Sequence, residues 1–447
     1  MSHNKESNND ETPKVLGLAI VGCGQIVTHH IEAMASALAG KLELRALVDP
    51  SPERRSVIQD LATTKYGPQL YKQEPRPFDT LDQLMMAGDD EFFATQIDII
   101  FIAVPHDLHE SLAIQALFVD GDTKNSTTGK IVVMEKPLAP TRDSCDTLVQ
   151  VSEDLLQKGT TTTTATKTKS SSMLIIAEQS PYWQEVALAR SIIAEAGDNN
   201  NNTNDKKRKR EIDNNGGDIG HIVTAASYYY ESMRDNVTSG SVEASGGMGW
   251  RGSLKRAGGG ITIDGGLHWI RPLREMLGRR ITKVVAVARR NLEPKLQMEG
   301  ESCAHALLEM EAAANFDEPK GSGPLVATYS CNMLATAPMA HDACPYFRIT
   351  GTKGELIIHG DGLFRENPGA GGLRLYNDEH PHGKELFPAD RRGGFFLGFS
   401  GLWKEIYRIG TAGDYQAAHE SVLRAADDVR VALAMYKSAK SSQWETV

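Results

Sequence analysis

The first 180 residues alternate between continuous apolar segments of strand length and amphipathic segments with helical spacing. Strands that are apolar on both faces are typical of a parallel sheet covered by helices on both sides. The expected strands are VLGLAIVG, LELRALVD, IDIIFIAV, KIVVME and MLIIAE, with helices such as IVTHHIEAMASALA between them. The alternation therefore predicts an α/β domain with a doubly wound parallel sheet over residues 14–180.

The rest of the chain has a different pattern. A helix, QEVALARSIIAEAG, is followed by strand segments that are in several cases joined by short turns, which favours antiparallel pairing. These segments are HIVTAASYYYE, KVVAVARRN, SCAHALLEME, LVATYSCNM, YFRITGT, GELIIHG and LRLYN. A long helix from about His419 to Ala439 follows. We therefore expect a second, α+β domain over residues 181–447, with a mostly antiparallel open sheet.

Three segments lack the apolar residues that a packed structure requires. Residues 1–13 are expected to form a disordered tail, and two low-complexity insertions, at about 159–172 and 198–218, to form mobile loops. Each insertion falls between a predicted helix and a predicted strand. The run Lys206–Arg210 resembles a nuclear localisation signal, although a solvated basic loop is the simpler interpretation.

Composition excludes several classes of function. The formal net charge of -10 argues against nucleic acid as a partner. The five cysteines show no paired spacing, which fits a reducing compartment and predicts neither a disulfide framework nor a zinc site. No apolar run of about 18 residues predicts a membrane span, and the polar N-terminus is unlike a signal peptide. We expect a cytoplasmic protein, with nuclear entry as the alternative that the basic run leaves open.

Two glycines, Gly22 and Gly24, lie in the turn between the first expected strand and the first expected helix. This strand–turn–helix context is the one that a dinucleotide-binding fingerprint requires, although its third position is Val27 rather than glycine or alanine. We predict that a pyrophosphate lies over the turn, on the helix N-terminus formed by Gln25 and Ile26. The alternative is a tight turn without a ligand.

An acidic residue, Asp49, ends the second expected strand, where a carboxylate usually binds the hydroxyls of the adenosine ribose. Its charge would repel a 2′-phosphate, so the sequence predicts NAD as the cofactor. Arg54 and Arg55 follow closely, and they keep NADP as the alternative. His29 and His30 are expected to be helix residues rather than metal ligands, and no metal is expected.

Further motifs follow the glycine turn in a fixed order. They are Pro105-x3-His109, Glu135-Lys136-Pro137, and a segment that starts at Trp250 and holds three consecutive glycines, Asp264 and His268. This set resembles the Gfo/Idh/MocA family, named for glucose–fructose oxidoreductase, inositol dehydrogenase and rhizopine catabolism. The resemblance implies an N-terminal Rossmann domain and a C-terminal domain whose open sheet often mediates oligomers. It also implies nicotinamide-dependent oxidation or reduction of a sugar-like alcohol or ketone.

The resemblance also implies roles for individual residues. Lys136 matches a lysine that lies between cofactor and substrate. Asp264 and His268 match the family's Asp-x3-His pair, in which the histidine usually transfers the proton. Cofactor contacts are implied for Pro105, His109, Glu135 and Lys136.

This sequence departs from the family pattern at two places near the expected substrate. Arg271 stands where the family often has an acid, and EQSPYW replaces a segment of the Asn-x-x-Phe type. The family alone therefore does not name the substrate. The candidate substrate-binding residues are Tyr182, Trp250, Arg251 and Arg271.

The residues also fit the chemistry without the resemblance. Oxidation of an alcohol requires a base for the hydroxyl proton, and histidine suits this role because it titrates near neutrality. Asp264 and His268, four residues apart, would share one helix face, so that Asp264 holds the imidazole. Lys136 would stabilise a developing alkoxide. We further expect Gly258–Gly260 to allow close packing under the substrate, and Pro272 to break or kink the helix after His268.

The predicted function is therefore an NAD(P)-dependent oxidoreductase that acts on a sugar, a polyol or a related cyclic alcohol or ketone. The alternatives are a non-catalytic NAD(P)-binding regulator and a redox-neutral glycoside hydrolase that uses NAD transiently. Singly, Asp264 could be a helix cap and His268 a buried structural histidine, but their joint presence with Lys136 favours catalysis. The expected partners are a small molecule and further copies of the chain, bound through the C-terminal sheet, with no nucleic acid and no membrane.

Overall fold

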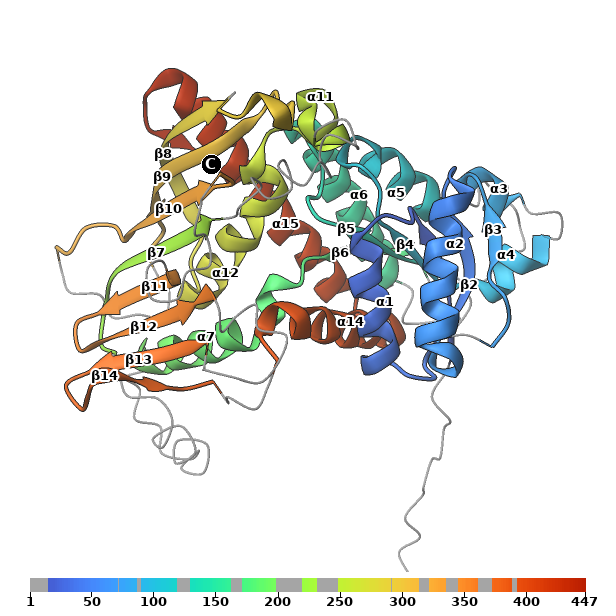
Figure 1. Cartoon of the computed structure of the whole chain (residues 1–447), viewed down its shortest axis with the longest axis horizontal. Helices are drawn as coiled ribbons and strands as arrows, with labels where there is room; N and C mark the ends of the chain where they lie inside the picture. Colours follow the sequence, from blue (N-terminus) through green and yellow to red (C-terminus); the bar gives the residue numbers. More distant parts are fainter. Residues whose placement is uncertain are drawn as a thin grey trace, which may run out of the picture.

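Two β-sheets organise the described part of the chain (Figure 1). The computed structural model describes residues 15–70, 72–86, 90–118, 129–161, 171–197, 219–230, 248–290, 292–312, 321–334, 345–360, 372–387 and 392–447. One sheet has six strands in the order β3-β2-β1-β4-β5-β6, and the other has nine in the order β14-β13-β12-β11-β7-β10-β9-β8-β15. The predicted fold class, a doubly wound parallel sheet followed by an α+β part, is confirmed.

The strands of the six-stranded sheet all pair in parallel. They are β1 (Leu16–Val21), β2 (Leu42–Val48), β3 (Arg76–Phe78), β4 (Ile99–Ile102), β5 (Ile131–Glu135) and β6 (Met173–Ala177). Helices connect them, namely α1 (Ile26–Ala37), α2 (Pro52–Asp60), α3 (Leu81–Met85), α4 (Asp90–Gln96), α5 (His109–Leu117) and α6 (Arg142–Thr161). The sequence does not predict β3, because it has only three residues and one is a proline.

The nine-stranded sheet is mostly antiparallel, as predicted, but β7 and β10 pair in parallel. Its strands are β7 (Ile222–Tyr230), β8 (Ile281–Arg290), β9 (Glu301–Met310), β10 (Val326–Asn332), β11 (Pro345–Gly351), β12 (Gly354–His359), β13 (Leu373–Asn377), β14 (His380–Glu385) and β15 (Glu445–Thr446). Burial alternates along β9 and distinguishes the two faces of this sheet, because Ala304 and Ala306 are buried and Leu307 is exposed. The buried face packs against α12 (Leu267–Leu277) and α15 (Tyr415–Ser441).

Two C-terminal helices join the sheets to each other. Helix α15 contacts β6 and α6 on one side and β8 on the other, so it lies between the two sheets (Figure 1). Helix α14 (Gly394–Ala412) packs along α1, and α7 (Gln184–Gly197) packs against α12. The C-terminal segment thus covers part of the N-terminal sheet. The domain boundary at residue 180 stays a prediction.

Helix α14 is absent from the sequence prediction, and its glycines explain why. Glycine lowers helix propensity by about 1 kcal/mol relative to alanine. In the structure, a Cβ at Gly398 would lie 2.6 Å from a ring carbon of Trp183, and a Cβ at Gly401 would lie 2.8 Å from the Cβ of Tyr182. The residues that obscure the helix in the sequence are therefore those that let it pack closely.

Two further local signals, the helix cap at Ser51 and the proline at position 272, had different outcomes. Ser51 caps α2 as its position before Pro52 suggests, because its hydroxyl accepts a hydrogen bond from the amide of Arg54 at 3.3 Å. Of the expected break or kink at Pro272, the break is wrong, because α12 continues to Leu277. The apolar face of α12 is buried against β7 and α7, and this burial outweighs the proline's cost of about 3 kcal/mol.

Several expectations concern residues outside the described part of the chain. The expected tail at 1–13 and the insertion at 198–218, with its basic run, lie there entirely, as does most of the insertion at 159–172. Within the described part, no helix is long and apolar enough to cross a membrane. The cysteines described, Cys23, Cys145, Cys303 and Cys331, are all free thiols.

A buried ion-pair network fixes α12 to α15 and generates a stability prediction. Asp428 is 2% exposed and accepts hydrogen bonds from Arg271, at 2.6 Å, and from Arg274. Removal of one partner leaves buried charges unpaired, so Asp428→Ala should lower the free energy of unfolding by about 3–5 kcal/mol. The measurement is urea denaturation.

The matched control lies on the same helix. Glu420 forms an exposed ion pair with Arg424, so Glu420→Ala should change stability by about 1 kcal/mol or less. Equal effects of Asp428→Ala and Glu420→Ala would contradict the assignment of a structural role to the buried network.

Candidate functional site

The turn after β1 contains two glycines, Gly22 and Gly24, whose surroundings differ. Gly22 has φ +91°, and a Cβ there would lie 2.2 Å from the carbonyl oxygen of Ala103, so the protein's own backbone requires this glycine. A Cβ at Gly24 would meet nothing within 4 Å. Internal packing therefore explains one glycine, and the open space over Gly24 fits the close approach of a phosphate.

Helix α1 presents an open N-terminus at this turn. It begins at Ile26, its N-cap residue Gln25 makes no side-chain capping bond, and its first turn has no acid. The amides of Val27 and Thr28 donate to the carbonyls of Gly24 and Gln25, and the partial positive charge of the terminus favours an anion. Val27 is fully buried in the helix–sheet core, so a larger residue is accommodated at the third fingerprint position.

Asp49 lies beside the same turn, at the end of β2. Its Oδ2 accepts a hydrogen bond from the amide of Cys23 at 2.8 Å, and its Oδ1 accepts one from the amide of Ser51 at 2.9 Å. A carboxylate has lone pairs for further donors, so these bonds leave capacity for ribose hydroxyls. Arg55 is engaged by Asp79 at 2.6 Å, and Arg54 is exposed. The role of Asp49 as a ribose ligand stays a prediction.

Lys136 and Asp264, 128 residues apart in sequence, meet at the carboxyl edge of the parallel sheet. Lys136 directly follows β5, and its Nζ donates a hydrogen bond to the backbone carbonyl of Asp264 at 2.7 Å. The same Nζ lies 3.7 Å from the Asp264 Oδ1. The structure therefore brings together two of the three predicted catalytic residues.

Further cationic and imidazole groups surround the Asp264 carboxylate. Arg251 Nε lies 3.0 Å from its Oδ2, and His106 Nε2 lies 3.6 Å from its Oδ1. Burial opposes ionisation of Asp264, but the charges of Arg251 and Lys136 outweigh it and hold its pKa well below the usual value. Burial lowers the pKa of His106 to about 3, although Asp264 opposes this shift. Asp264 is therefore ionised and His106 neutral at neutral pH.

The third predicted residue, His268, has a partner that the sequence analysis missed. Its Nδ1 lies 2.9 Å from Oε1 of Glu178, the residue that directly follows β6. The expectation that Asp264 holds the imidazole is therefore corrected. Residues Thr262–Gly266 form a π-helical turn, in which i→i+5 bonding replaces the α-helical spacing that the prediction assumed.

A buried carboxylate on β9 anchors the turn that carries Asp264. Glu301 is 1% exposed, and its oxygens accept hydrogen bonds from the amides of Gly260 and Thr262, both at 2.9 Å. The hydroxyl of Tyr436 on α15 also donates to Glu301, at 3.0 Å. No local sequence signal identifies Glu301, because the amides it accepts from lie about 40 residues earlier in the chain.

The three glycines before this turn pack against the protein itself. A Cβ at Gly258 would lie 2.4 Å from the carbonyl oxygen of Pro140, one at Gly259 2.2 Å from the hydroxyl of Tyr436, and one at Gly260 2.1 Å from the carbonyl oxygen of Glu301. The close packing that we predicted is present. It brings the backbone against β9, α15 and the segment after β5, and the placement of these glycines under a substrate stays a prediction.

His109, from the second motif, contacts the segment that holds Lys136. His109 is fully buried, with Nδ1 2.7 Å from the carbonyl oxygen of Pro137 and Nε2 3.1 Å from that of Val104. It therefore ties the segment that starts at Pro105 to the segment that holds Lys136. The cofactor contacts expected of Pro105 and His109 stay predictions.

Glu135 belongs to a second buried network behind Lys136. Its Oε1 lies 2.7 Å from Nε2 of His30, and Trp403 Nε1 donates to His30 Nδ1 at 2.9 Å. His30 therefore donates from Nε2, and the network joins β5 to α1 and α14. His29 and His30 both lie on α1, as expected. Within the described part of the chain, no group of three or more His, Cys, Asp or Glu side chains is arranged to hold a metal ion.

The candidate substrate residues divide into two pairs. Trp250 and Arg251 join the Asp264 cluster, because the Trp250 ring lies 4.6 Å from the His106 ring and the Arg251 guanidinium lies 4.4 Å from the Trp250 ring. Tyr182 instead packs against α14, where burial raises its pKa to about 12. Arg271 is 4% exposed and pairs with α15, as described above.

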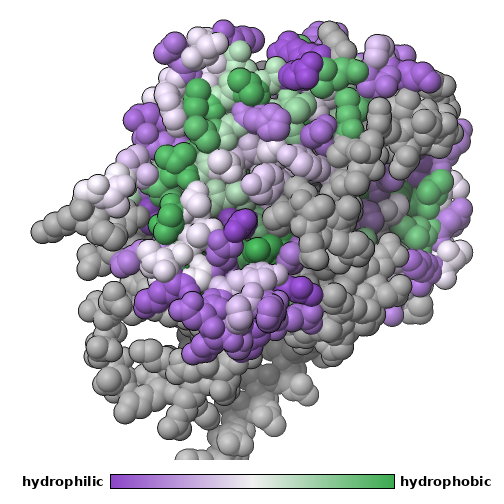
Figure 2. Space-filling view, turned by 60° about the vertical axis from the view of Figure 1, so that its left-hand side comes forward, coloured by the Kyte–Doolittle hydropathy of each residue, from purple (hydrophilic) through white to green (hydrophobic). Residues whose placement is uncertain are grey.

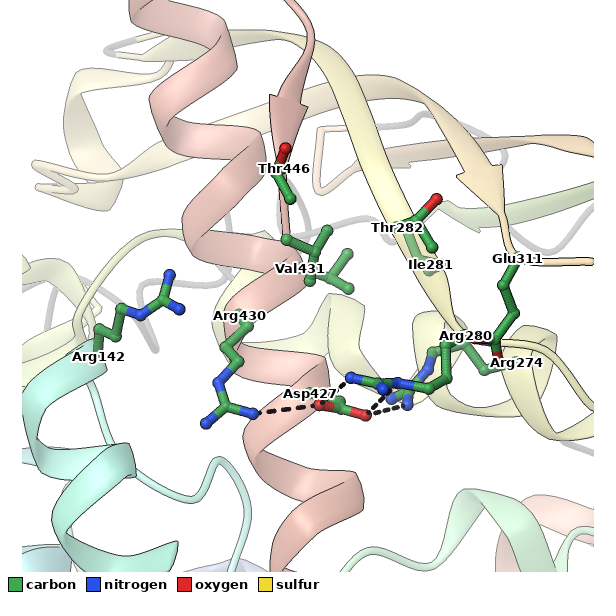
Figure 3. Close-up of a pocket in the computed structure, with 11 residues that line it drawn as sticks. Arg142, Arg274, Arg280, Ile281, Thr282, Glu311, Asp427, Arg430, Val431 and Thr446 are labelled. Carbon is green, nitrogen blue, oxygen red and sulfur yellow. Dashed lines mark hydrogen bonds and ion pairs between the residues drawn. The ribbon is translucent and has the colours of Figure 1, made fainter. Parts of the chain in front are cut away.

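A cavity of about 250 Å³ lies apart from this cluster, between α6, α12, β8 and α15 (Figure 3). Its residues are Arg142, Arg274, Arg280, Ile281, Thr282, Glu311, Asp427, Arg430, Val431, Thr446 and Val447. Asp427 lies at its centre, 3.0–3.3 Å from the guanidinium groups of Arg274, Arg280 and Arg430. Asp427 offsets part of this positive charge, and Arg274 and Arg430 pair further with Asp428 and Asp146, so we interpret the cavity as a structural ion-pair network.

Two family models match the sequence. The model described as an oxidoreductase family with an NAD-binding Rossmann fold matches residues 16–158, and the GFO/IDH/MocA C-terminal domain model matches residues 214–357. Together they cover more than half of the chain. Among curated proteins, no sequence matches.

Solved structures share the architecture over nearly the whole chain. An aldose-aldose oxidoreductase from Caulobacter crescentus, complexed with glycerol, is 18% identical with a TM-score of 0.64, and the match covers 97% of this chain and 100% of that one. A levoglucosan dehydrogenase in complex with NADH is 17% identical with a TM-score of 0.64, over 97% and 99%. GenD2 from gentamicin A biosynthesis, in complex with NAD, is 19% identical with a TM-score of 0.60, over 97% of each chain.

The geometry of the glycine turn predicts how it responds to substitution. Gly24→Val should abolish NAD binding by calorimetry, because the side chain would fill the space over the turn. The thermal midpoint should stay close to that of the wild type, since Gly24 has an ordinary φ and open space around its Cα. Gly22→Val should instead unfold the protein. Undiminished NAD binding to a folded Gly24→Val protein would show that the pyrophosphate lies elsewhere.

Asp49 predicts the choice of cofactor. Its carboxylate should make the dissociation constant for NAD smaller than that for NADP, because a 2′-phosphate would approach a negative charge. Calorimetric titration with both dinucleotides measures the difference. Tighter binding of NADP would mean that Asp49 does not face the ribose.

Proposed function

The chain belongs to the GFO/IDH/MocA oxidoreductase family, and we propose that it transfers a hydride between NAD and a sugar, a polyol or a related cyclic alcohol or ketone. The observation that carries this proposal is the meeting of Lys136 with Asp264, and of His268 with Glu178, at the carboxyl edge of the parallel sheet. Ligands of such sheets bind at this edge. The fold shared with an aldose oxidoreductase and a levoglucosan dehydrogenase supports the substrate class.

The residues divide the chemistry between them. The ionised Glu178 accepts a hydrogen bond from the Nδ1–H of His268, which leaves Nε2 free to accept the proton of a substrate hydroxyl. The ammonium of Lys136 stabilises the negative charge that develops on the substrate oxygen. Asp264 holds Lys136 and Arg251 in place. When bound, NAD accepts the hydride from the substrate carbon.

A non-catalytic regulator has no need of such an arrangement. A site that only binds a nucleotide does not require an imidazole whose orientation is set by a buried carboxylate. The His268 side chain has such a partner in Glu178 and is 12% exposed. A redox-neutral hydrolase would use the same hydride transfer transiently, and product analysis separates it from a dehydrogenase. Net formation of NADH with an oxidised product is the outcome that we expect.

The open face of the nine-stranded sheet supports self-association. The described helices cover the opposite face, and Val287 on β8 and Leu307 on β9 are 63% and 42% exposed. Figure 2 shows apolar side chains exposed on this side of the molecule. We propose that a second copy of the chain binds this face and that the protein forms a homo-oligomer. We further propose that it acts in the cytoplasm, with nuclear entry as the alternative tied to the basic run.

The central test concerns His268. His268→Ala should reduce turnover in the oxidation direction by about 10²–10⁴-fold, the scale of a positioned acid–base group. The dissociation constant for NAD should hardly change, because the residue acts on the substrate. A panel of inositols, aldoses, sugar acids and cyclic diols, followed at the nicotinamide absorbance, identifies a substrate first.

The matched control is His382→Ala, since His382 lies exposed on β14, at the edge of the nine-stranded sheet. It should leave turnover unchanged. Wild-type turnover by His268→Ala on an active substrate would make His268 a structural residue and refute the mechanism.

A further inference from the structure

The carboxylate that contacts His268 belongs to Glu178, which lies outside the Asp-x3-His motif. Glu178 directly follows β6 of the parallel sheet, whereas His268 lies on α12. We propose that Glu178 is the positioning residue of His268. It fixes the tautomer that carries hydrogen on Nδ1, directs the free Nε2 to the substrate, and stabilises the imidazolium that forms when Nε2 takes the proton. This inference rests on the proposed role of His268 as the proton acceptor.

The position of the shared hydrogen follows from the ionisation of Glu178. Burial opposes ionisation, but His268, Arg271 and the hydrogen bond from Ser180 outweigh it and lower the pKa of Glu178 to about 2. An ionised carboxylate carries no hydrogen, so the hydrogen in the 2.9 Å contact lies on Nδ1 of His268. A neutral imidazole with hydrogen on Nδ1 has its lone pair on Nε2.

Glu178 is itself held in one place. It is 5% exposed, and the Oε1 that faces His268 also accepts a hydrogen bond from the amide of Ser180 at 2.8 Å. Behind it, the charge of Arg271 lowers its pKa. Arg271 is in turn fixed by Asp428 on α15, at 2.6 Å. The network in Figure 3 continues this chain, because Arg274 joins Asp428 to Asp427.

The arrangement accounts for a departure noted in the sequence. An arginine at position 271, where an acid is expected, would leave an unpaired cation beside the histidine. Glu178 and Asp428 both face Arg271, and both raise its pKa against the effect of burial. The acid that would follow His268 along the helix is thus replaced by an acid from the end of β6, and Arg271 keeps that acid ionised.

Asp264 is the other carboxylate near His268, and its contacts direct it elsewhere. Its Oδ2 binds Arg251 at 3.0 Å, and its Oδ1 lies 3.7 Å from Lys136 and 3.6 Å from His106. The two carboxylates therefore have separate tasks, since Asp264 pairs with cationic side chains and Glu178 orients the imidazole.

The first experiment does not need a substrate. The full chain, bound to NAD and labelled with ¹⁵N in its histidines, reports the tautomer of His268 by NMR, and the resonance is assigned by its loss in His268→Ala. We expect hydrogen on Nδ1 in the wild type and a mixture of tautomers in Glu178→Ala. Hydrogen on Nε2 in the wild type, or the same tautomer in both proteins, would overturn the inference whatever the substrate is.

The second experiment separates charge from geometry. Glu178→Gln keeps an oxygen that can accept from His268 and Ser180 but removes the negative charge. With an active substrate, turnover should fall about 10-fold in Glu178→Gln and on the order of 10²-fold in Glu178→Ala, with NAD affinity unchanged. The acidic limb of the kcat/KM profile should move to lower pH in Glu178→Gln, because the imidazolium loses its anionic partner while Arg271, Asp428 and Asp264 remain.

The matched control is Glu185→Gln on α7. Glu185 is also fully buried and accepts a hydrogen bond from a backbone amide, that of Gly394 at 3.2 Å. It should leave turnover and the pH profile at their wild-type values. A wild-type profile and turnover in Glu178→Gln would make Glu178 structural. If His268→Ala were fully active, the proposed function of His268 would fail instead, independently of the tautomer result.

Discussion

The contact between the Lys136 ammonium and the Asp264 backbone carbonyl joins the two sheets at the candidate site. It requires that a turn from the second part of the chain lie against the carboxyl edge of β5. Glu301 and Tyr436 hold that turn by its backbone amides, and the glycines before it permit the close approach. The position of the turn is thus set by hydrogen bonds between its main-chain atoms and the side chains of Lys136, Glu301 and Tyr436.

Charge balance follows from the burial of this site. A buried ion is tolerated only when it is paired and hydrogen-bonded. Asp264 meets this condition with Arg251 and Lys136, and Glu178 meets it with Ser180 and Arg271. The result is two ionised carboxylates on either side of one histidine, held apart by their separate cationic partners.

The sequence predicted much of the fold because the relevant signals are local. Period, capping and turn residues identified β1, α1, β2, α2 and the later strands, and Ser51 caps its helix as its position suggests. It also placed the glycine turn, Lys136, Asp264 and His268 in one site. It failed at β3 and α14, where proline or glycine removed the local signal, and at Pro272, where burial of a helix face outweighed the proline.

By itself, the sequence determined the order of strands and helices, the Gly24 turn and the pair Lys136 and Asp264, which meet at the sheet edge. Only the tertiary structure decided which carboxylate holds His268. Glu178 lies 90 residues before that histidine, and no periodicity or spacing connects the two. The physical reason is that a hydrogen bond between distant segments depends on where the sheet edge and the π-helical turn come together, and this is set by packing rather than by local propensity.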